Sequence, residues 1–139
     1  MRWKILRMTG ANICKSYIAP GLFFGGSGLN VARGAILNYD CFIDATGRVD
    51  ICENASIGPQ STILTVTHHI SSHVKRRGEE QIVLPTYIGT GAWLGARVTV
   101  LPGCRIGSGC VIAAGSVVTE DCDDNWLYAG VPAKKIREL

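Results

Sequence analysis

Large aliphatic side chains recur at every sixth position over the second half of the chain: Ile88, Leu94, Val100, Ile106, Ile112 and Val118. A small or β-branched residue follows four positions after each of the first five: Ala92, Val98, Cys104, Cys110 and Ser116. A six-residue period drifts around an α-helix of 3.6 residues per turn, whereas short strands joined by a bend every six residues keep each column on one side. The pattern therefore predicts an all-β solenoid of stacked coils with both columns inside.

Two shorter sets with the same period come earlier in the chain: Val31, Leu37 and Ile43, and then Ile51, Ile57 and Ile63. The register of the second set puts Thr67 in the small column. A two-residue slip around Gly47-Arg48 separates the two sets, and residues 64–87 separate the second set from the long run. We expect one solenoid domain over residues 1–139, with a kink at the slip and one loop, about residues 64–87, that leaves the stack.

Charge and hydropathy limit the possible partners. The formal net charge is +3 over 139 residues, and the basic residues are scattered apart from Lys75–Arg77 and Lys134-Lys135. This balance does not favour nucleic acid binding. No stretch approaches the roughly 18 continuous apolar residues of a membrane helix, and Met1–Gly10 is too short and too charged for a signal peptide. We expect a cytoplasmic protein without membrane insertion.

The six cysteines follow the repeat rather than a disulfide or zinc pattern. Cys41, Cys104 and Cys110 fall in the small inward column, where a thiol acts as a small apolar filler. No CxxC pair is present, so a thiolate zinc site is not expected. Without a secretory signal, the reduced state is the expected one.

The segment IGTGAWLGARVTVLPGCRIGSGCVIAAGSVVTEDCDDNWLYAGVPAKKI, residues 88–136, resembles the hexapeptide-repeat acyltransferases, especially the sugar O-acetyltransferase branch with maltose and galactoside acetyltransferases. The likeness extends back to Asn38. It implies a left-handed parallel β-helix of triangular section with a short C-terminal extension, and a homotrimer with sites at subunit interfaces. It also implies acetyl-CoA as acyl donor, a sugar or sugar-containing acceptor and no metal. The N-terminal MRWKILRMTGANI resembles polysaccharide-associated members, which favours a role in polysaccharide biosynthesis, although the segment could simply cap the solenoid.

All three histidines lie in the interruption, in TVTHHISSHVKRR, residues 65–77. Its first four residues match a family segment whose last residue is the catalytic base. The resemblance therefore implies that His68 accepts the proton of an acceptor hydroxyl or amine as that atom attacks the thioester of acetyl-CoA. Direct transfer is expected, because no Ser or Cys sits in a recognised nucleophile motif. The plain alternative is a loop histidine that caps a backbone carbonyl; His69, His73 and Lys75–Arg77 receive no assigned role.

Further positions match family residues one by one. Asn38 and Asp44 match the neighbourhood of the acceptor, although either could serve only as a turn residue. Trp93 matches a residue that borders the acyl and coenzyme site. The remaining matches are to coenzyme contacts, with the small residues along the pantetheine groove and the two basic ones at the phosphates: Ala96, Ala114, Thr119, Lys134 and Arg137. For the basic residues the alternative is a charged C-terminal tail.

Two other functions remain open. A carbonic-anhydrase-like branch of the same repeat superfamily consists of metal-dependent hydratases with three zinc-bound histidines. Its ligands come from separate positions and neighbouring subunits, whereas the histidines here crowd into residues 68–73. The other alternative is a non-catalytic trimeric scaffold that keeps only the solenoid.

Overall fold

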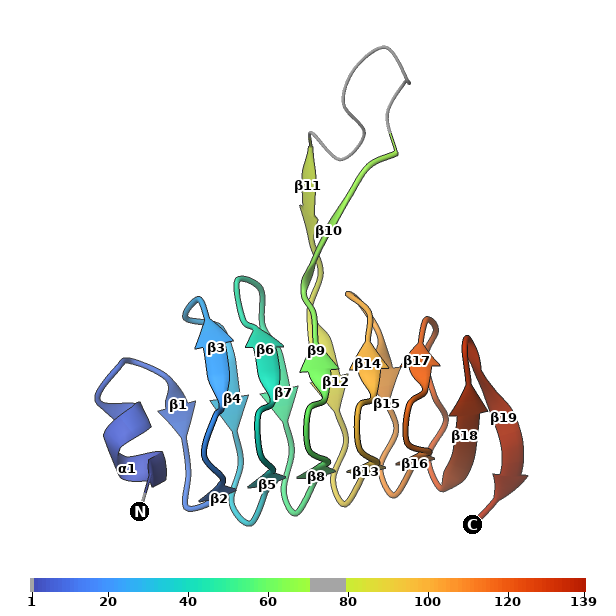
Figure 1. Cartoon of the computed structure of the whole chain (residues 1–139), viewed down its shortest axis with the longest axis horizontal. Coiled ribbons are helices and arrows are strands. Elements are labelled where there is room, and N and C mark those ends of the chain that lie inside the picture. The colour runs from blue at the N-terminus through green and yellow to red at the C-terminus, as the bar shows by residue number, and fades with distance from the viewer. Residues whose placement is uncertain (1, 71–79) are drawn as a thin grey trace.

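The computed structural model describes residues 2–70 and 80–139, and these form a left-handed parallel β-helix whose three sheets are the sides of a triangular section (Figure 1). Sheet A contains β1 (Asn12–Ile13), β4 (Leu29–Val31), β7 (Val49–Ile51), β12 (Thr86–Ile88) and β15 (Arg105–Ile106). Sheet B contains β2 (Tyr17–Ile18), β5 (Ile36–Leu37), β8 (Ser56–Ile57), β13 (Trp93–Leu94), β16 (Val111–Ile112), β18 (Trp126–Gly130) and β19 (Ala133–Glu138). Sheet C contains β3 (Phe23–Gly25), β6 (Phe42–Asp44), β9 (Thr62–Ile63), β14 (Thr99–Val100) and β17 (Val117–Val118).

The predicted aliphatic columns form the core. In sheet A, Ile51 pairs with Ile88 and Ile88 with Ile106, so residues of one column sit directly above one another. All six members of the long run are at most 1% exposed. Full burial of each such side chain contributes roughly 1.5–3 kcal/mol relative to exposure. The expected all-β solenoid is confirmed.

The three cysteines of the inward column are buried, as the repeat predicts. Burial raises the pKa of Cys41 and of Cys104, which keeps these thiols protonated. All six cysteines are free thiols. The inward thiols therefore act as small apolar fillers between coils.

The bends between sheets stack into two corners that matter for function. We call the bends at residues 38–41, 58–61, 95–98 and 113–116 the B–C corner. Those at residues 44–48, 101–104 and 119–122, with the insertion as described in residues 64–70 and 80–85, form the C–A corner. Coils approach closely at the B–C corner, because a Cβ atom built on Gly95 would lie 2.6 Å from the backbone nitrogen of Ala114. Glycine is therefore required there to let one coil rest on the next.

Both irregularities of the repeat lie at the C–A corner. The slip at Gly47-Arg48 lengthens the bend between β6 and β7, and the long insertion leaves the next coil at the same corner. The insertion begins and ends as an antiparallel pair, β10 (Val66–His68) with β11 (Gln81–Val83), which we call the arm. Figure 1 shows the arm projecting away from the solenoid.

The insertion is shorter than the expected residues 64–87. The Leu64 backbone N–H donates to the Val100 carbonyl (3.0 Å), and the Thr86 N–H donates to the Arg48 carbonyl (2.9 Å), so both ends remain within the stack. Thr67 lies in β10 outside the inward column and is only partly buried, whereas Thr65 is fully buried. The register prediction for Thr67 is therefore wrong, because the chain leaves the coil two residues earlier.

Each end of the solenoid is covered. At the N-terminal end α1 (Arg2–Arg7) packs against β1 and β2, with Trp3 and Leu6 against the core. At the other end β18 and β19 form an antiparallel hairpin, which is the expected short extension. No helix in residues 2–70 or 80–139 is long and apolar enough to cross a membrane.

Candidate functional site

His68 lies on the arm rather than in an irregular loop. It is the last residue of β10, its Cα is paired with that of Gln81, and its side chain is exposed. The pairing of the two segments continues at the next residue, because the His69 N–H donates to the Glu80 carbonyl (3.1 Å). The backbone on both sides of His68 is therefore fixed. His73 and Lys75–Arg77 lie outside the described residues.

The base of the arm is held by the carboxylate of Asp44. Its Oδ2 atom accepts hydrogen bonds from the backbone N–H groups of Thr65 (3.1 Å) and Val66 (3.0 Å). Its Oδ1 atom accepts one from the Thr46 N–H (3.1 Å). One carboxylate thus joins the lengthened bend of one coil to the arm of the next.

The Thr65 hydroxyl completes this contact. It donates to the Asp44 carbonyl oxygen (3.0 Å) and accepts from the Gly47 N–H (2.9 Å). Glycine is needed at position 47 because a Cβ atom there would lie 2.7 Å from Val83 Cγ1 and 3.0 Å from Thr65 Cβ. We call Asp44, Gly47 and Thr65 the arm clamp. Sequence reasoning missed Gly47 and Thr65; the slip after Gly47 was the only signal for them.

The clamp affects the ionisation of Asp44. Partial burial acts to raise the pKa of this carboxyl, but hydrogen bonds from Thr46 and Thr65 outweigh it and hold the pKa below the ordinary range. The carboxylate is therefore charged at neutral pH and makes charge-assisted bonds to the arm.

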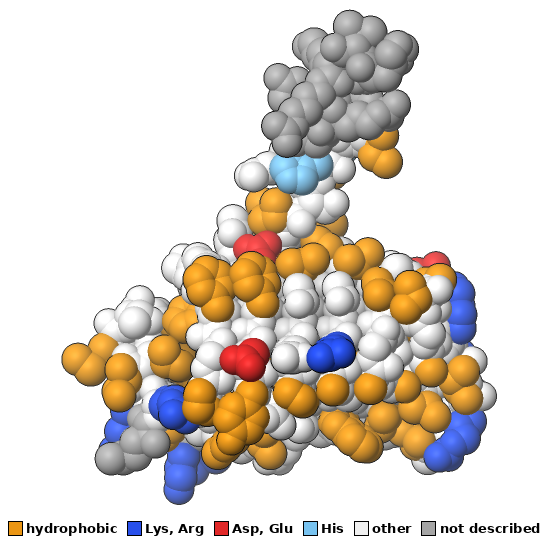
Figure 2. Space-filling model, in the orientation of Figure 1, with side chains coloured by type: hydrophobic (Ala, Val, Ile, Leu, Met, Phe, Trp, Pro, Cys, Tyr) orange, Lys and Arg blue, Asp and Glu red, His pale blue; other side chains and the backbone are white. Residues whose placement is uncertain are grey.

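A second group of predicted residues lies along the B–C corner. Asn38, Ala96 and Ala114 occupy this corner on different coils, and the Gly115 N–H donates to the Ala96 carbonyl (2.8 Å). The Asn38 side-chain oxygen accepts from the Tyr39 N–H (2.9 Å), so this amide does serve the turn. In Figure 2 this corner is a largely white band that runs along the solenoid between two rows of hydrophobic side chains. Such a band leaves backbone groups accessible to an amide-containing ligand.

Trp93 lies beside this corner on the outer face of sheet B. It pairs with Ser56 on one side and Val111 on the other, and its side chain is 56% exposed. A large exposed aromatic side chain on a flat sheet is available to a ligand or to another subunit. The sequence expectation that Trp93 is not a core residue is confirmed.

The remaining predicted coenzyme residues lie at the C-terminal end. Thr119 follows β17 at the C–A corner, whereas Lys134 and Arg137 lie on β19. A hollow of about 210 Å³ is lined by Glu120, Tyr128, Lys134 and Lys135. The Lys134 Nζ lies 3.9 Å from Glu120 Oε1, and both groups are exposed, so this pair is weak.

Apart from Thr119, Lys134 and Arg137, the predicted residues form two groups on one chain. Asn38, Ala96 and Ala114, with Trp93 nearby, follow the B–C corner, whereas His68 and Asp44 lie at the C–A corner or on the arm that leaves it. Sheet C separates the two corners. Within residues 2–70 and 80–139, no group of three or more His, Cys, Asp or Glu residues is placed to hold a metal ion.

Comparisons with known proteins agree with the fold. Residues 85–120 match the family described as bacterial transferase hexapeptide (six repeats). The chain is 37% identical over 125 residues to the galactoside O-acetyltransferase of Escherichia coli. The aligned region covers 89% of this chain and 61% of that protein. The chain thus spans less than two thirds of the length of this relative.

Two solved structures are also similar. The maltose O-acetyltransferase of Clostridium difficile superimposes with a TM-score of 0.90 at 29% identity, covering 99% of this chain and 74% of that one. A hexapeptide-repeat acetyltransferase of Vibrio cholerae, solved in complex with acetyl coenzyme A, superimposes with a TM-score of 0.91 at 27% identity. This match covers 99% of this chain and 76% of the other. Residues 85–120 therefore carry the hexapeptide repeats of bacterial transferases, and the chain resembles sugar O-acetyltransferases of this kind in sequence and in fold.

Proposed function

We propose that this protein is an O-acetyltransferase that moves an acetyl group from acetyl-CoA to a hydroxyl of a sugar or sugar-containing acceptor. The observation that carries the proposal is the placement of His68, whose backbone is held by the β10–β11 ladder and whose arm is clamped to the solenoid. A general base must be positioned before it can act. The similarity to sugar O-acetyltransferases supplies the reaction class.

The proposed step is a direct transfer. The imidazole of His68 takes the proton of the acceptor hydroxyl while that oxygen attacks the thioester carbonyl carbon of acetyl-CoA. The tetrahedral intermediate then collapses, the carbon–sulfur bond breaks, and the imidazolium returns the proton to the leaving thiolate. A neutral imidazole suits this task near pH 7. The products are the acetyl ester and free coenzyme A, and no covalent acyl-enzyme is required.

The coenzyme is proposed to lie along the B–C corner. Small residues at Ala96 and Ala114 leave the backbone open to the pantetheine amides, and Trp93 lies beside this path. Lys134 and Arg137 at the C-terminal end are exposed and basic, so their charges fit the phosphates of coenzyme A. Thr119 is proposed as a further coenzyme contact.

We infer that the complete site forms between copies in a homotrimer. His68 and the B–C corner residues lie on opposite sides of sheet C in one chain. An assembly that sets the arm of one copy beside the B–C corner of the next brings the two groups together. Exposed apolar side chains on the outer faces of sheets B and C, including Phe23, Phe42 and Trp93, fit such contacts.

Two measurements test this proposal. Release of the coenzyme A thiol is followed with nucleotide sugars, free sugars and amines as acceptors. Acceptor-dependent release with a sugar hydroxyl supports the function, whereas release with amines alone identifies an N-acetyltransferase and overturns it. Coenzyme A binding by calorimetry separates an enzyme from a scaffold, because a scaffold would not bind it.

The shared site is tested by co-expressing two inactive variants. His68→Ala removes the base, and Ala114→Trp places a bulky side chain at an exposed position of the B–C corner. If sites combine residues of two copies, mixed assemblies contain some intact sites and activity reappears. Mixed assemblies as inactive as either variant alone would show that each chain builds its own site.

A further inference from the structure

Charge is unevenly divided along the chain. Residues 1–39 contain five basic residues and no Asp or Glu: Arg2, Lys4, Arg7, Lys15 and Arg33. Residues 40–139 contain nine basic and eleven acidic residues. Because the coils stack in sequence order, this difference becomes a difference between the two ends of the molecule. The N-terminal end is therefore positively charged, whereas the rest of the chain is nearly balanced.

The same end exposes large apolar side chains. On α1 and just after it, Ile5 is 65% exposed and Met8 is 87% exposed. Ile5 lies between Lys4 and Arg7, and Met8 directly follows Arg7. On the first coil Tyr17 is also more than half exposed. In Figure 2 basic and hydrophobic side chains meet at the lower left, where the N-terminal end lies.

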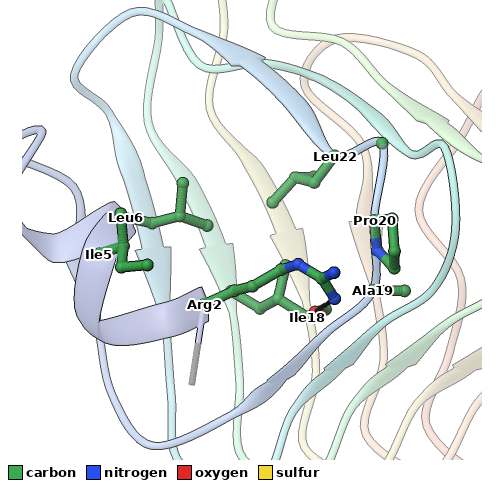
Figure 3. A pocket seen from close by; sticks show the side chains of 8 residues that line it. Arg2, Ile5, Leu6, Ile18, Ala19, Pro20 and Leu22 are labelled. Atoms are coloured by element: carbon green, nitrogen blue, oxygen red, sulfur yellow. Dashed lines mark hydrogen bonds between the residues drawn. The ribbon is translucent and has the colours of Figure 1, made fainter.

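A hollow of about 230 Å³ opens beneath α1 (Figure 3). Ile5 and Leu6 line it from the helix, and Ile18 and Leu22 line it from the first coil. Of the described residues that line it, only Arg2 is charged, and its guanidinium donates to the Ile18 carbonyl (3.3 Å). A cation thus lies at the edge of an apolar surface that faces outward.

We propose that the N-terminal end of this protein docks on the surface of an anionic lipid bilayer. Basic side chains around exposed apolar ones are the combination that binds the interface between headgroups and acyl chains. Arg2, Lys4 and Arg7 face the lipid phosphates, while Ile5 and Met8 enter the boundary of the acyl region. Each basic residue near such a surface contributes about a fivefold increase in binding. The docking is peripheral, and the long axis of the solenoid points away from the bilayer surface.

The chemistry of this end favours lipid over nucleic acid. A nucleic acid backbone is bound by cations alone and gains little from exposed aliphatic side chains. The opposite end of the solenoid provides an internal comparison, because its basic residues are interleaved with acidic ones. Lys134 approaches Glu120, and Lys135 is paired with Asp123. Residues 120–139 contain five acidic and three basic residues, so that end lacks the net positive charge that an anionic bilayer would attract.

The test uses the full-length protein and sedimentation with vesicles. Vesicles of phosphatidylcholine alone are compared with vesicles that also contain phosphatidylglycerol, at low and high salt. We expect binding to the anionic vesicles, weak binding to the neutral ones, and loss of most binding at high salt. Replacing two cations by Lys4→Gln and Arg7→Gln should lower the binding constant about 25-fold, and glutamine keeps the helix propensity of α1.

The matched control makes the same change of charge elsewhere. Arg97→Gln with Arg105→Gln removes two exposed basic residues away from the N-terminal end and should leave binding unchanged. Equal loss in both double variants would show a net-charge effect and overturn the proposal, as would failure of the wild-type protein to bind anionic vesicles. Ile5→Gln with Met8→Gln should also weaken binding. If this apolar variant binds as well as the wild type and heparin displaces both, the end is a polyanion site and not a membrane surface.

Folding and catalysis are monitored separately. Thermal unfolding of each variant shows whether α1 still covers the solenoid. Thiol release with a soluble acceptor in the absence of vesicles should be unaffected by the α1 variants, because none of these residues belongs to the proposed site. Membrane docking can therefore fail without affecting the proposed enzymatic function, and the reverse also holds.

Discussion

The two corners that flank sheet C are built from the same repeat but differ in regularity. At the B–C corner, residues such as Gly58, Gly95 and Ala114 follow one another without insertion, and coils touch through backbone atoms. At the C–A corner, one coil is lengthened at Gly47 and the next extends into the arm. In the proposed function, the regular corner provides most of the path for the coenzyme, whereas the irregular corner carries the proposed base. The proposal thus places most of the binding residues and the base on different corners of one chain.

The largest expected effect is on the catalytic side of this comparison. His68→Ala should lower turnover about 100- to 10,000-fold while the unfolding temperature and coenzyme A binding are kept, because the proposed role of the lost group is that of a base only. The turnover is measured as the rate of coenzyme A thiol release with the best acceptor. His69→Ala, the adjacent exposed histidine, is the control and should retain activity. Near-normal turnover in the His68 variant would remove this residue from the mechanism.

An intermediate effect is expected from the arm clamp. Asp44→Asn replaces a carboxylate that accepts from three backbone N–H groups, and hydrogen bonds to charged groups contribute about 1.5–3 kcal/mol each. We expect kcat to fall several-fold with little change in KM for acetyl-CoA, because the arm moves while the B–C corner is intact. Faster hydrogen exchange of β10 amides would accompany this. Asp40→Asn, at an exposed B–C position, is the matched control.

The clamp also has a pH signature. The pKa of Asp44 is lowered in the folded protein, so the unfolded chain takes up this proton at a higher pH than the folded one. Its stabilising contribution is complete above the ordinary aspartate pKa of about 4 and is lost as the pH falls through the lowered value. Stability measured across this acid range should fall less steeply in Asp44→Asn than in the wild type. Parallel curves for the two proteins would contradict the assignment of Asp44 as the clamp.

The smallest effect is expected at the exposed cations of the proposed coenzyme path. Lys134→Gln should raise KM for acetyl-CoA only a few-fold, because an exposed charge contact contributes roughly 0.2–1 kcal/mol. The effect should shrink as salt increases. Lys4→Gln, a lysine at the opposite end, serves as the control. An unchanged KM at low salt would assign Lys134 to the charged tail.

The repeat predicts much of the fold, but it predicts the candidate site only in part. Ile88 and its column identify the coils, and Trp93 is identified as an outward residue, because burial follows a strict period. The role of Thr65 was not predictable, since the hexad register continued to Thr67 while the chain had already left the stack. Asp44 matched the acceptor region, yet its carboxylate is engaged with the arm.

The sequence by itself determined the coils, their inward columns and the place where the stack is interrupted, because periodic burial is a local property of the chain. Only the tertiary structure decided that the slip at Gly47 and the insertion after Leu64 lie on one corner of neighbouring coils. Stacking brings together residues about twenty positions apart, so that the Asp44 carboxylate meets the N–H groups of Thr65 and Val66. Stacking likewise converts a difference in charge along the chain into a basic end of the molecule.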